Sequence, residues 1–313
     1  MEFGVSRRVV TIALAVLIII YVIRLTPREA VANRTKSFFD STTGVLKSAA
    51  DSTADVTADD DRPAFHIRDK VALLTDTQFS PRTIPLILHF HAVLGPDWPI
   101  VFYTSEETAN AHLRNGQNGS AVWNRAVASG AIDVRIIPDE YNMTTREGVN
   151  VYLSRPWLWR QLAPASHVLV FQTDAMICAN AHRTVDDFLE WDFIAAPLHT
   201  TQKLFNGGLS LRNRTMMLEI LDEDNNWEVE TAAGTWTLGG EDIWFSRKMD
   251  LRGAHLPTFD QAIKFACQHE WHTSREKEPL GYHKVHKVAQ SSLPEITKWC
   301  PEIALAAPGT LAQ

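Results

Sequence analysis

The sequence contains few cysteines and no excess of basic residues. Only three cysteines occur among its 313 residues, and no two of them have the C-x-x-C spacing. This excludes a disulfide framework and a zinc site of the usual pattern. The net charge of −7, with no compensating basic block, argues against a nucleic-acid partner. A hydrolase or another α/β enzyme is a weak alternative, because no G-x-S-x-G or Walker-type loop is present.

One uncharged apolar run lies close to the N-terminus. Residues 9–23 carry no charge, with Arg7 and Arg8 before them and Arg24 after them. At 1.5 Å per residue the run spans roughly 22 Å, which is short of the ~30 Å hydrocarbon core. A cleaved signal peptide with an A-x-A site at residues 30–32 and a buried core helix are the alternatives. We predict an uncleaved signal anchor, since ER and Golgi bilayers are thinner and flanking arginines can snorkel.

The composition changes after the apolar run. Up to about residue 66 the chain is rich in Ser, Thr, Ala and Asp and has almost nothing to bury, as expected of a solvated stem. The predicted organisation is therefore a cytoplasmic tail at 1–8, an anchor at 9–24, a flexible stem at 25–66, a folded domain at 67–290 and a C-terminal tail at 291–313.

The folded domain shows strands alternating with helices. Short apolar runs that end in polar residues predict buried strands, and apolar residues at helical spacing between them predict helices. This alternation predicts an α/β fold with a mostly parallel, doubly wound sheet. The predicted strands are 70–76, 99–104, 132–138, 167–171, 192–197 and 205–212, and the predicted helices include 81–94, 121–128, 149–162, 184–191 and 213–221.

The strand at residues 167–171 runs directly into Gln172, Thr173 and Asp174. In open α/β sheets, ligands bind just beyond the carboxyl ends of the strands. Asp174 is therefore a candidate ligand for a metal or a substrate. The alternative is that it only caps the following turn or helix.

Two further polar stretches follow in the second half. Asn206-Gly207-Gly208 precedes an alternating strand, and Glu241 and Asp242 stand at an expected helix start. Taken singly, the first reads as a tight turn. The second reads as two acids that complement the helix dipole.

Taken in order, these stretches resemble the GT-A class of nucleotide-sugar glycosyltransferases. The similarity is closest to a mainly fungal glycosyltransferase-like family catalogued as a domain of unknown function, over roughly residues 68 to 290. It implies a GT-A-like catalytic domain. The stretches that carry it are Gln172-Thr173-Asp174, Trp191–Pro197, Phe205–Arg212 and Glu241–Phe245.

The resemblance implies a divalent metal site. GT-A enzymes carry Asp-x-Asp at this strand end, and the last Asp binds a cation that bridges the donor diphosphate. Here Asp174 matches the last position, whereas Gln172 replaces the first acid. Mn²⁺ or Mg²⁺ prefers oxygen ligands and accepts diphosphate and water in its shell. A C-terminal histidine that completes the metal shell in many such enzymes is matched first by His283 and second by His286.

The resemblance also implies catalytic and donor-binding residues. Asp242, with Glu241 beside it, matches the base that takes the acceptor proton in inverting enzymes. The implied donor-binding residues are Thr75, Asp76, Arg155, Gln172, Thr173, Asp174, Asn206, Gly207 and Gly208.

A short anchor, a polar stem and a C-terminal catalytic domain imply a type II membrane protein of the Golgi or ER with a lumenal catalytic domain. Its implied partners are a nucleotide-sugar donor, a glycan, protein or lipid acceptor, and the membrane. In that compartment we expect Cys267 to pair with Cys300, which leaves Cys178 reduced. The alternative function is a non-catalytic GT-A-like carbohydrate-binding or scaffold protein, which the departure at Gln172 favours.

Overall fold

The computed structural model describes residues 64–114, 120–223 and 225–307. The chain divides into Met1–Asp61 and Arg62–Gln313, and all described residues belong to the second unit. The expected tail and anchor, and the expected stem up to residue 63, lie outside the described residues. Within the described ranges, no helix combines the length and the apolar character needed to cross a bilayer.

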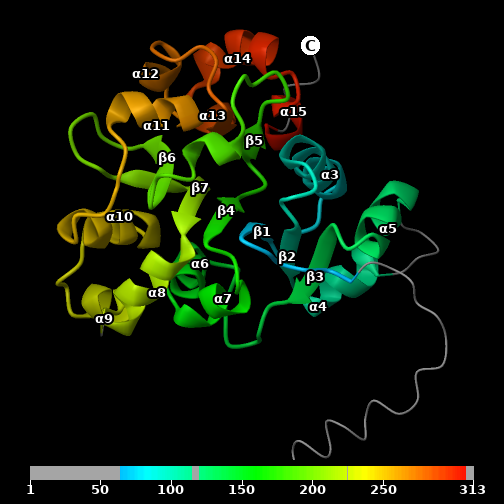
Figure 1. The fold of residues 1–313 in the computed structure, drawn as a ribbon, viewed down its shortest axis with the longest axis horizontal. Helices are drawn as coiled ribbons and strands as arrows, with labels where there is room; N and C mark the ends of the chain where they lie inside the picture. Colours follow the sequence, from blue (N-terminus) through cyan, green and yellow to red (C-terminus); the bar gives the residue numbers. More distant parts are fainter. Residues whose placement is uncertain (1–63, 115–119, 224, 308–313) are drawn as a thin grey trace, which may run out of the picture. The chain divides into compact units, whose positions relative to one another are not determined.

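Six strands form the central sheet in the order β3-β2-β1-β4-β7-β6 (Figure 1). Strands β3, β2, β1 and β4 are parallel to one another, whereas β7 is antiparallel to both β4 and β6. The mostly parallel sheet that the alternation of strands and helices predicts is therefore confirmed. The strands are β1 (Lys70–Thr75), β2 (Ile100–Thr104), β3 (Ile132–Ile136), β4 (His167–Phe171), β6 (Phe193–Pro197) and β7 (Phe205–Asn213).

The two central parallel strands, β1 and β4, are apolar because both faces of the sheet are covered. Residues 71–74 and 168–171 are buried, and each Val, Leu or Phe side chain among them contributes roughly 1.5–3 kcal/mol of transfer free energy. Phe171 stacks on Phe90 of α3 (Thr83–Leu94), with ring centroids 3.9 Å apart. Leu74 pairs with Phe171 across the two strands, so the polar residues that follow each strand come side by side.

The prediction of one continuous helix at 149–162 is wrong. The structure has two helices there, α6 (Arg146–Leu153) and α7 (Pro156–Gln161), with Arg155 as the N-cap of the second. Pro156 has no backbone N–H and restricts the residue before it, so it starts a helix rather than continuing one. The predicted helix at 184–191 is a short 3₁₀ turn, η2 (Val185–Phe188).

The predicted helix at 81–94 begins two residues later than expected, because α3 starts at Thr83 after a turn. Predicted helices 121–128 and 213–221 correspond to α5 (Ala121–Ala128) and α8 (Arg214–Asp222), which Ser120 and Asn213 cap with side-chain oxygens. The other helices are α4 (Glu106–Thr108), η1 (Ala109–Leu113), α9 (Trp227–Ala232), α10 (Glu241–Leu251), α11 (Phe259–Phe265), α12 (Glu270–Thr273), α13 (Val285–Val288), η3 (Gln290–Ser292), α14 (Leu293–Trp299) and α15 (Ile303–Ala306).

A second sheet adjoins the end of β4. Its order is β5-β9-β8, formed by β5 (Ala175–Ile177), β9 (Gly281–His283) and β8 (Ala266–Cys267). Ala175 pairs with His283 in an antiparallel ladder. Because β5 follows β4 after three residues, the second sheet brings the region around residue 283 to the carboxyl end of the central strand.

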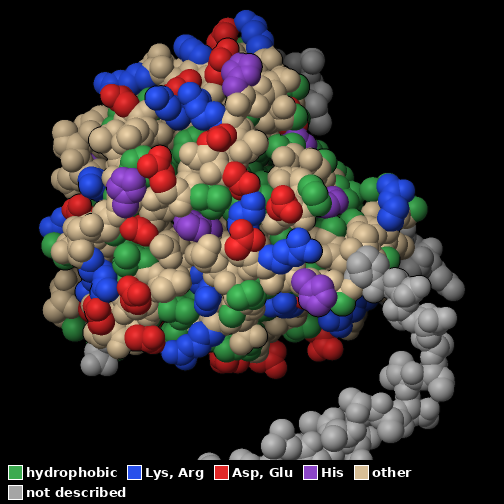
Figure 2. Space-filling view, in the orientation of Figure 1, with side chains coloured by type: hydrophobic (Ala, Val, Ile, Leu, Met, Phe, Trp, Pro, Cys, Tyr) green, Lys and Arg blue, Asp and Glu red, His purple; other side chains and the backbone are tan. Residues whose placement is uncertain are grey.

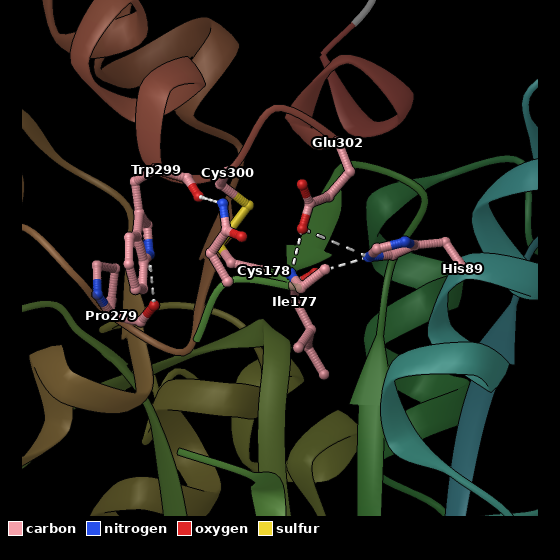
Figure 3. Close-up of a disulfide and its surroundings, with 9 residues drawn as sticks. His89, Ile177, Cys178, Pro279, Trp299, Cys300 and Glu302 are labelled. Carbon is pink, nitrogen blue, oxygen red and sulfur yellow. Dashed lines mark hydrogen bonds and ion pairs between the residues drawn. A yellow bond between two sulfur atoms is a disulfide. The ribbon is translucent and has the colours of Figure 1, made fainter. Parts of the chain in front are cut away.

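The C-terminal segment, residues 291–307, belongs to the folded domain, so these residues do not form the tail expected from residue 291. Helices α14 and α15 bury Ile296, Ile303 and Ala306. Figure 3 shows how this segment is fastened to the end of β5. Glu302 accepts a hydrogen bond from the Ala179 amide, and the Asn180 side chain donates to the Trp299 carbonyl at 2.8 Å.

The expected disulfide between Cys267 and Cys300 is wrong. Cys178 pairs with Cys300, with Cα atoms 5.0 Å apart (Figure 3). Cys267 lies in β8, where it is fully buried and its thiol donates to the Ile263 carbonyl. Cys178 directly follows β5 and meets the C-terminal segment, a long-range contact that the spacing of three cysteines does not encode.

Candidate active site

The turn between β4 and β5 presents Gln172, Thr173 and Asp174. The Gln172 amide donates to the Gly208 carbonyl of β7 at 2.8 Å, and the Ala175 amide donates to the Gln172 carbonyl at 2.9 Å. The Lys284 amide donates to the Asp174 carbonyl at 2.8 Å. The backbone of this turn is therefore held by both sheets, which leaves its side chains available at the carboxyl end of β4.

Asp174 and His283 are brought together, as the resemblance implies. Asp174 Oδ1 lies 3.1 Å from His283 Nε2, and the side chains are 26% and 4% exposed. His283 Nδ1 lies 3.3 Å from Gln268 Oε1, and its Nε2 is also 3.3 Å from Gln172 Oε1. Burial raises the pKa of Asp174, but the hydrogen bond and charge of His283, together with the charges of His286 and Lys284, lower that pKa overall.

These residues fit part of a divalent-cation shell. Two adjacent ligands of an octahedral ion with bonds of about 2.1 Å lie roughly 3 Å apart, which matches the separation of 3.1 Å between Asp174 Oδ1 and His283 Nε2. A Nδ1–H donated to Gln268 leaves the Nε2 lone pair of His283 free to bind a metal. Among the described residues, no group of three or more His, Cys, Asp or Glu side chains is placed to hold an ion. The remaining ligands would therefore come from water or a bound substrate.

A second carboxylate lies beside Asp174, on the neighbouring strand. Asp76 follows β1, and its Oδ2 accepts a hydrogen bond from Thr173 Oγ1 at 3.1 Å. Burial raises the pKa of Asp76, and the charge of Asp174 adds to the shift. Thr75, the last residue of β1, contacts the Tyr152 hydroxyl at 3.5 Å. The end of β1 thus places a carboxylate on the same cavity as Asp174, linked to the β4–β5 turn through Thr173.

A cavity of about 370 Å³ adjoins these strand ends. Its lining includes the predicted residues Thr75, Asp76, Gln172, Thr173 and Asp174. It also includes three basic side chains, one from the residue that precedes α3 and two from α13. These are Arg82, His286 and Lys287. Of the three, sequence reasoning named only His286. On the face of the molecule drawn in Figure 2, acidic and basic side chains are interspersed.

The Asn206-Gly207-Gly208 stretch begins strand β7 and is not a tight turn. A Cβ atom on Gly208 would lie 2.1 Å from His283 Nε2, and one on Gly207 would lie 3.0 Å from the Asp242 Cβ. The Asn206 side chain accepts a hydrogen bond from the Gly208 amide at 2.9 Å. The two glycines are needed for close approach, since the start of β7 runs between His283 on one face and Asp242 on the other.

The two acids at the start of α10 occupy different environments. Asp242 is half-buried, and its Oδ2 accepts a hydrogen bond from the Gly207 amide at 2.8 Å. Glu241 is 3% exposed and is held by the Arg212 guanidinium at 2.9 and 3.2 Å. Asp242 is therefore partly exposed to solvent, whereas the Glu241 oxygens face inward. Asp242 is not among the residues that line the cavity.

Arg155 is not brought to the cavity. Its guanidinium forms a two-pronged pair with Glu228 of α9 at 2.8 and 3.0 Å and lies over the Tyr141 ring at 5.9 Å. Trp157, its neighbour in α7, packs among Tyr103, Tyr141 and Tyr152. The aromatic residues of this region pack on the sheet.

Comparison with protein families gives one match. Residues 131–283 match the model of a family described as a protein of unknown function (DUF5672). The matched stretch includes Asp174, Gly208 and Asp242 and ends at His283, whereas Asp76 and Arg82 precede it. The expected similarity to a family of unknown function is thus found over this stretch. A search of curated protein sequences gave no match.

Several solved structures of glycosyltransferases are similar to the chain. Apo glycosyltransferase GlyE from Streptococcus pneumoniae TIGR4 has a TM-score of 0.42 at 11% identity, covering 69% of this chain and 54% of its own. Mannosyltransferase PcManGT from Pyrobaculum calidifontis, in complex with GDP-Man and Mn²⁺, has a TM-score of 0.42 at 11% identity, covering 72% and 64%. Galactosyltransferase LgtC, with donor and acceptor sugar analogues, has a TM-score of 0.41 at 12% identity, covering 68% and 86%. The chain thus spans between half and two thirds of the length of the first two.

Proposed function

We propose that the chain is a GT-A-type glycosyltransferase that moves a sugar from a nucleoside-diphosphate donor to an acceptor hydroxyl. The observation that carries the proposal is the contact of 3.1 Å between Asp174 and His283. It lies at the carboxyl end of β4, beside a cavity with basic side chains. A carboxylate and an imidazole can hold a divalent cation, and such a cation together with Arg and Lys side chains can bind the diphosphate of a nucleotide sugar.

The cavity is the proposed donor site. The diphosphate is an anion, and Arg82 and Lys287 are the cations of the lining that would face it. Asp76 and Thr75, at the end of β1, are the proposed contacts to the nucleoside. Asp174 and His283 would hold a Mn²⁺ or Mg²⁺ ion, with Gln172 Oε1 close to the same histidine nitrogen. When bound, the ion supplies positive charge that stabilises the leaving diphosphate.

Asp242 is the proposed base. The acceptor oxygen forms a bond to the anomeric carbon as the bond from that carbon to the diphosphate oxygen breaks. The diphosphate leaves with the electron pair, and the acceptor proton passes to the Asp242 carboxylate. Glu241 is not assigned this role, because its oxygens are buried against Arg212.

The location in the secretory pathway is also a proposal. A signal anchor at 9–24 and a stem at 25–66 would place the catalytic domain in the lumen of the ER or Golgi. The Cys178–Cys300 disulfide supports this, because disulfides persist in oxidising compartments. Two N-x-[ST] glycosylation motifs lie in the described part of the chain. Asn142, in the motif Asn142-Met143-Thr144, is exposed, whereas the Asn213 side chain caps α8 and donates a hydrogen bond to Asp192.

A non-catalytic carbohydrate-binding protein is the second candidate. Gln172 favours it, because it stands where the glycosyltransferase pattern has its first acid. The contact of 3.1 Å between Asp174 and His283 favours the enzyme instead, since it presents a carboxylate and an imidazole that can hold a cation without a second acid.

The test is a screen of the purified full-length chain for Mn²⁺-dependent hydrolysis or transfer from UDP- and GDP-sugars. Asp174→Asn is expected to lower turnover by roughly 10²–10³-fold, and Asp242→Asn to lower kcat by roughly 10²–10⁴-fold. Asp222→Asn is the matched control, because that carboxylate is 63% exposed and pairs only at the surface with Arg160. Binding of sugar without nucleotide binding or turnover would establish the second candidate and refute the first.

A further inference from the structure

Arg212 and Glu241 form an ion pair that is completely enclosed. The side chains are 0% and 4% exposed, and both guanidinium nitrogens Nη1 and Nη2 reach the carboxylate, at 2.9 and 3.2 Å. By contrast, the partners of Arg160–Asp222 are 60% and 63% exposed. Burying two charges costs desolvation, so an enclosed pair is weak evidence for stability and calls for another role.

The Arg212 guanidinium occupies the space directly under Gly207. Its Nε donates to Ser210 Oγ at 2.9 Å, and Ser210 Oγ in turn donates to the Gly207 carbonyl at 2.9 Å. A Cβ atom on Gly207 would lie 2.5 Å from Arg212 Nη2. The aromatic rings of Phe193 and Trp159 lie 4.8 and 5.7 Å from the guanidinium carbon. The guanidinium is thus confined from several sides and defines where the Gly207 backbone can lie.

The other partner of the pair is joined to the proposed base. Glu241 is the first residue of α10, and Asp242 is the second. Asp242 accepts a hydrogen bond from the Gly207 amide at 2.8 Å, while the Glu241 amide donates to Asn150 Oδ1 at 3.3 Å. The interactions therefore close a ring that runs from Arg212 through Glu241, Asp242 and Gly207 and back through Ser210.

We propose that Arg212 and Glu241 are positioning residues that hold Asp242 in place against the first residues of β7. The inference rests on the proposed function only in naming Asp242 as the base. Without the pair, the start of β7 is joined to α10 by two hydrogen bonds. The Gly207 amide donates to the Asp242 carboxylate, and the Phe205 amide donates to Ser246 Oγ at 3.2 Å. Only the first of them reaches the Asp242 side chain. A displacement of about 1 Å at a catalytic group is enough to cost roughly 10²-fold in rate.

The test replaces both charges at once, since a single substitution leaves the other charge buried and unpaired. Well-packed apolar replacements of a buried pair are often neutral for stability, so Arg212→Met/Glu241→Leu is expected to fold. Its kcat should fall roughly 10²-fold while KM for the nucleotide sugar stays within about threefold. In an Asp242→Asn background the same double change should cost nothing further, because residues that act as one unit are not additive.

A matched control and a readout independent of catalysis complete the test. Arg160→Met/Asp222→Leu removes an exposed pair of the same type and should change none of these quantities. Hydrogen exchange at the Gly207 amide should be at least tenfold faster in Arg212→Met/Glu241→Leu than in the wild type, whether or not the chain proves to be a transferase. Unchanged Gly207 exchange, or losses that simply add to those of Asp242→Asn, would overturn the positioning role.

If the double variant does not fold, Arg212→Lys supplies the same measurements. Lysine keeps the charge but loses the two-pronged geometry. It should give a smaller loss of kcat and a smaller acceleration of Gly207 exchange in the same direction. If kcat and Gly207 exchange in Arg212→Lys both equal those of the wild type, the proposal is rejected. If the wild type shows no activity in the donor screen but Gly207 exchange is faster in the variant, only the proposed function is refuted.

Discussion

At the scale of single residues, Gly208 is the position at the site where an added side chain would come closest to a neighbouring side chain. A Cβ atom at this position would lie 2.1 Å from His283 Nε2, 2.4 Å from its Cε1 and 2.5 Å from its Cδ2. The imidazole rests on the Gly208 backbone, and its neighbours Gln268 and Asp174 restrict where else it can move. The identity of residue 208 therefore decides whether His283 can face Asp174.

Gly208→Ala is expected to displace the His283 ring and weaken Mn²⁺ binding by roughly 10–100-fold, the usual cost of disturbing the surroundings of a metal ligand. Titration of the purified chain with Mn²⁺, followed by calorimetry or electron paramagnetic resonance, measures this. Gly234→Ala is the control. Gly234 has a φ of +70° with nothing within 4 Å of an added Cβ, so that variant should lose about 1 kcal/mol of stability and keep its Mn²⁺ affinity. Equal affinity in Gly208→Ala and wild type would exclude His283 as a ligand.

At the scale of elements, the start of α12 (Glu270–Thr273) depends on a neutral histidine. His272 Nδ1 accepts hydrogen bonds from the amides of Gln268 and His269, at 2.9 and 3.1 Å. A protonated Nδ1 cannot accept either bond. Burial lowers the pKa of His272 to about 3, and the nearby His269 adds to the shift. Gln268 also contacts His283, so this turn supports the candidate metal site.

The lowered pKa of His272 predicts a loss of stability in acid. The pKa in the folded state is about 3, below the ordinary value of ~6.5. The stabilisation is therefore fully present above pH ~6.5 and is lost as the pH falls toward 3, by at most about 1.4 kcal/mol per unit.

His272→Asn tests this, because its amide oxygen can accept the same backbone bonds without titrating. Between pH 7.5 and 5.0, the wild type should lose about 2 kcal/mol more of its free energy of unfolding than the variant does. Urea unfolding at the two pH values measures the difference. Parallel pH dependence in the two proteins would contradict the role assigned to His272.

At the scale of the whole molecule, the C-terminal segment connects β5 with the start of α3. It reaches β5 through the Cys178–Cys300 disulfide and the contacts of Glu302 and Trp299 (Figure 3). It reaches α3 through the Leu305 carbonyl, which accepts a hydrogen bond from Arg82 at 2.8 Å. Arg82 lines the proposed donor cavity, so the cavity depends on residues far apart in the chain.

Removal of the disulfide is expected to destabilise the whole domain. The bonded cysteines are 122 residues apart, and closing a loop of that order restricts the unfolded chain by about 4–5 kcal/mol. Cys300→Ala should therefore lower the melting temperature markedly, and a reducing agent should lower that of the wild type but not of the variant. Cys267→Ala is the control, because Cys267 is unpaired and buried, and it should leave the sensitivity to reductant intact. A wild type insensitive to reductant would contradict the disulfide.

Much of the strand pattern was predictable, because it depends on local burial. The runs at 70–75 and 167–171 are apolar since both faces of the sheet are covered, and this is visible residue by residue. The break at Pro156 was also encoded locally, although the helical spacing around it hid the break. The apolar pattern after residue 290 is too short to predict α14 and α15.

The sequence by itself determined that polar side chains follow buried strands, and thereby which residues lie at the carboxyl edge of the sheet. Only the tertiary structure decided which of them meet. It set Asp76 beside Thr173, enclosed Glu241 with Arg212, directed Arg155 to Glu228 and paired Cys178 rather than Cys267 with Cys300. The physical reason is that periodicity reports how each residue is buried. Its partners depend instead on strand order and on crossings between distant segments, which no local pattern contains.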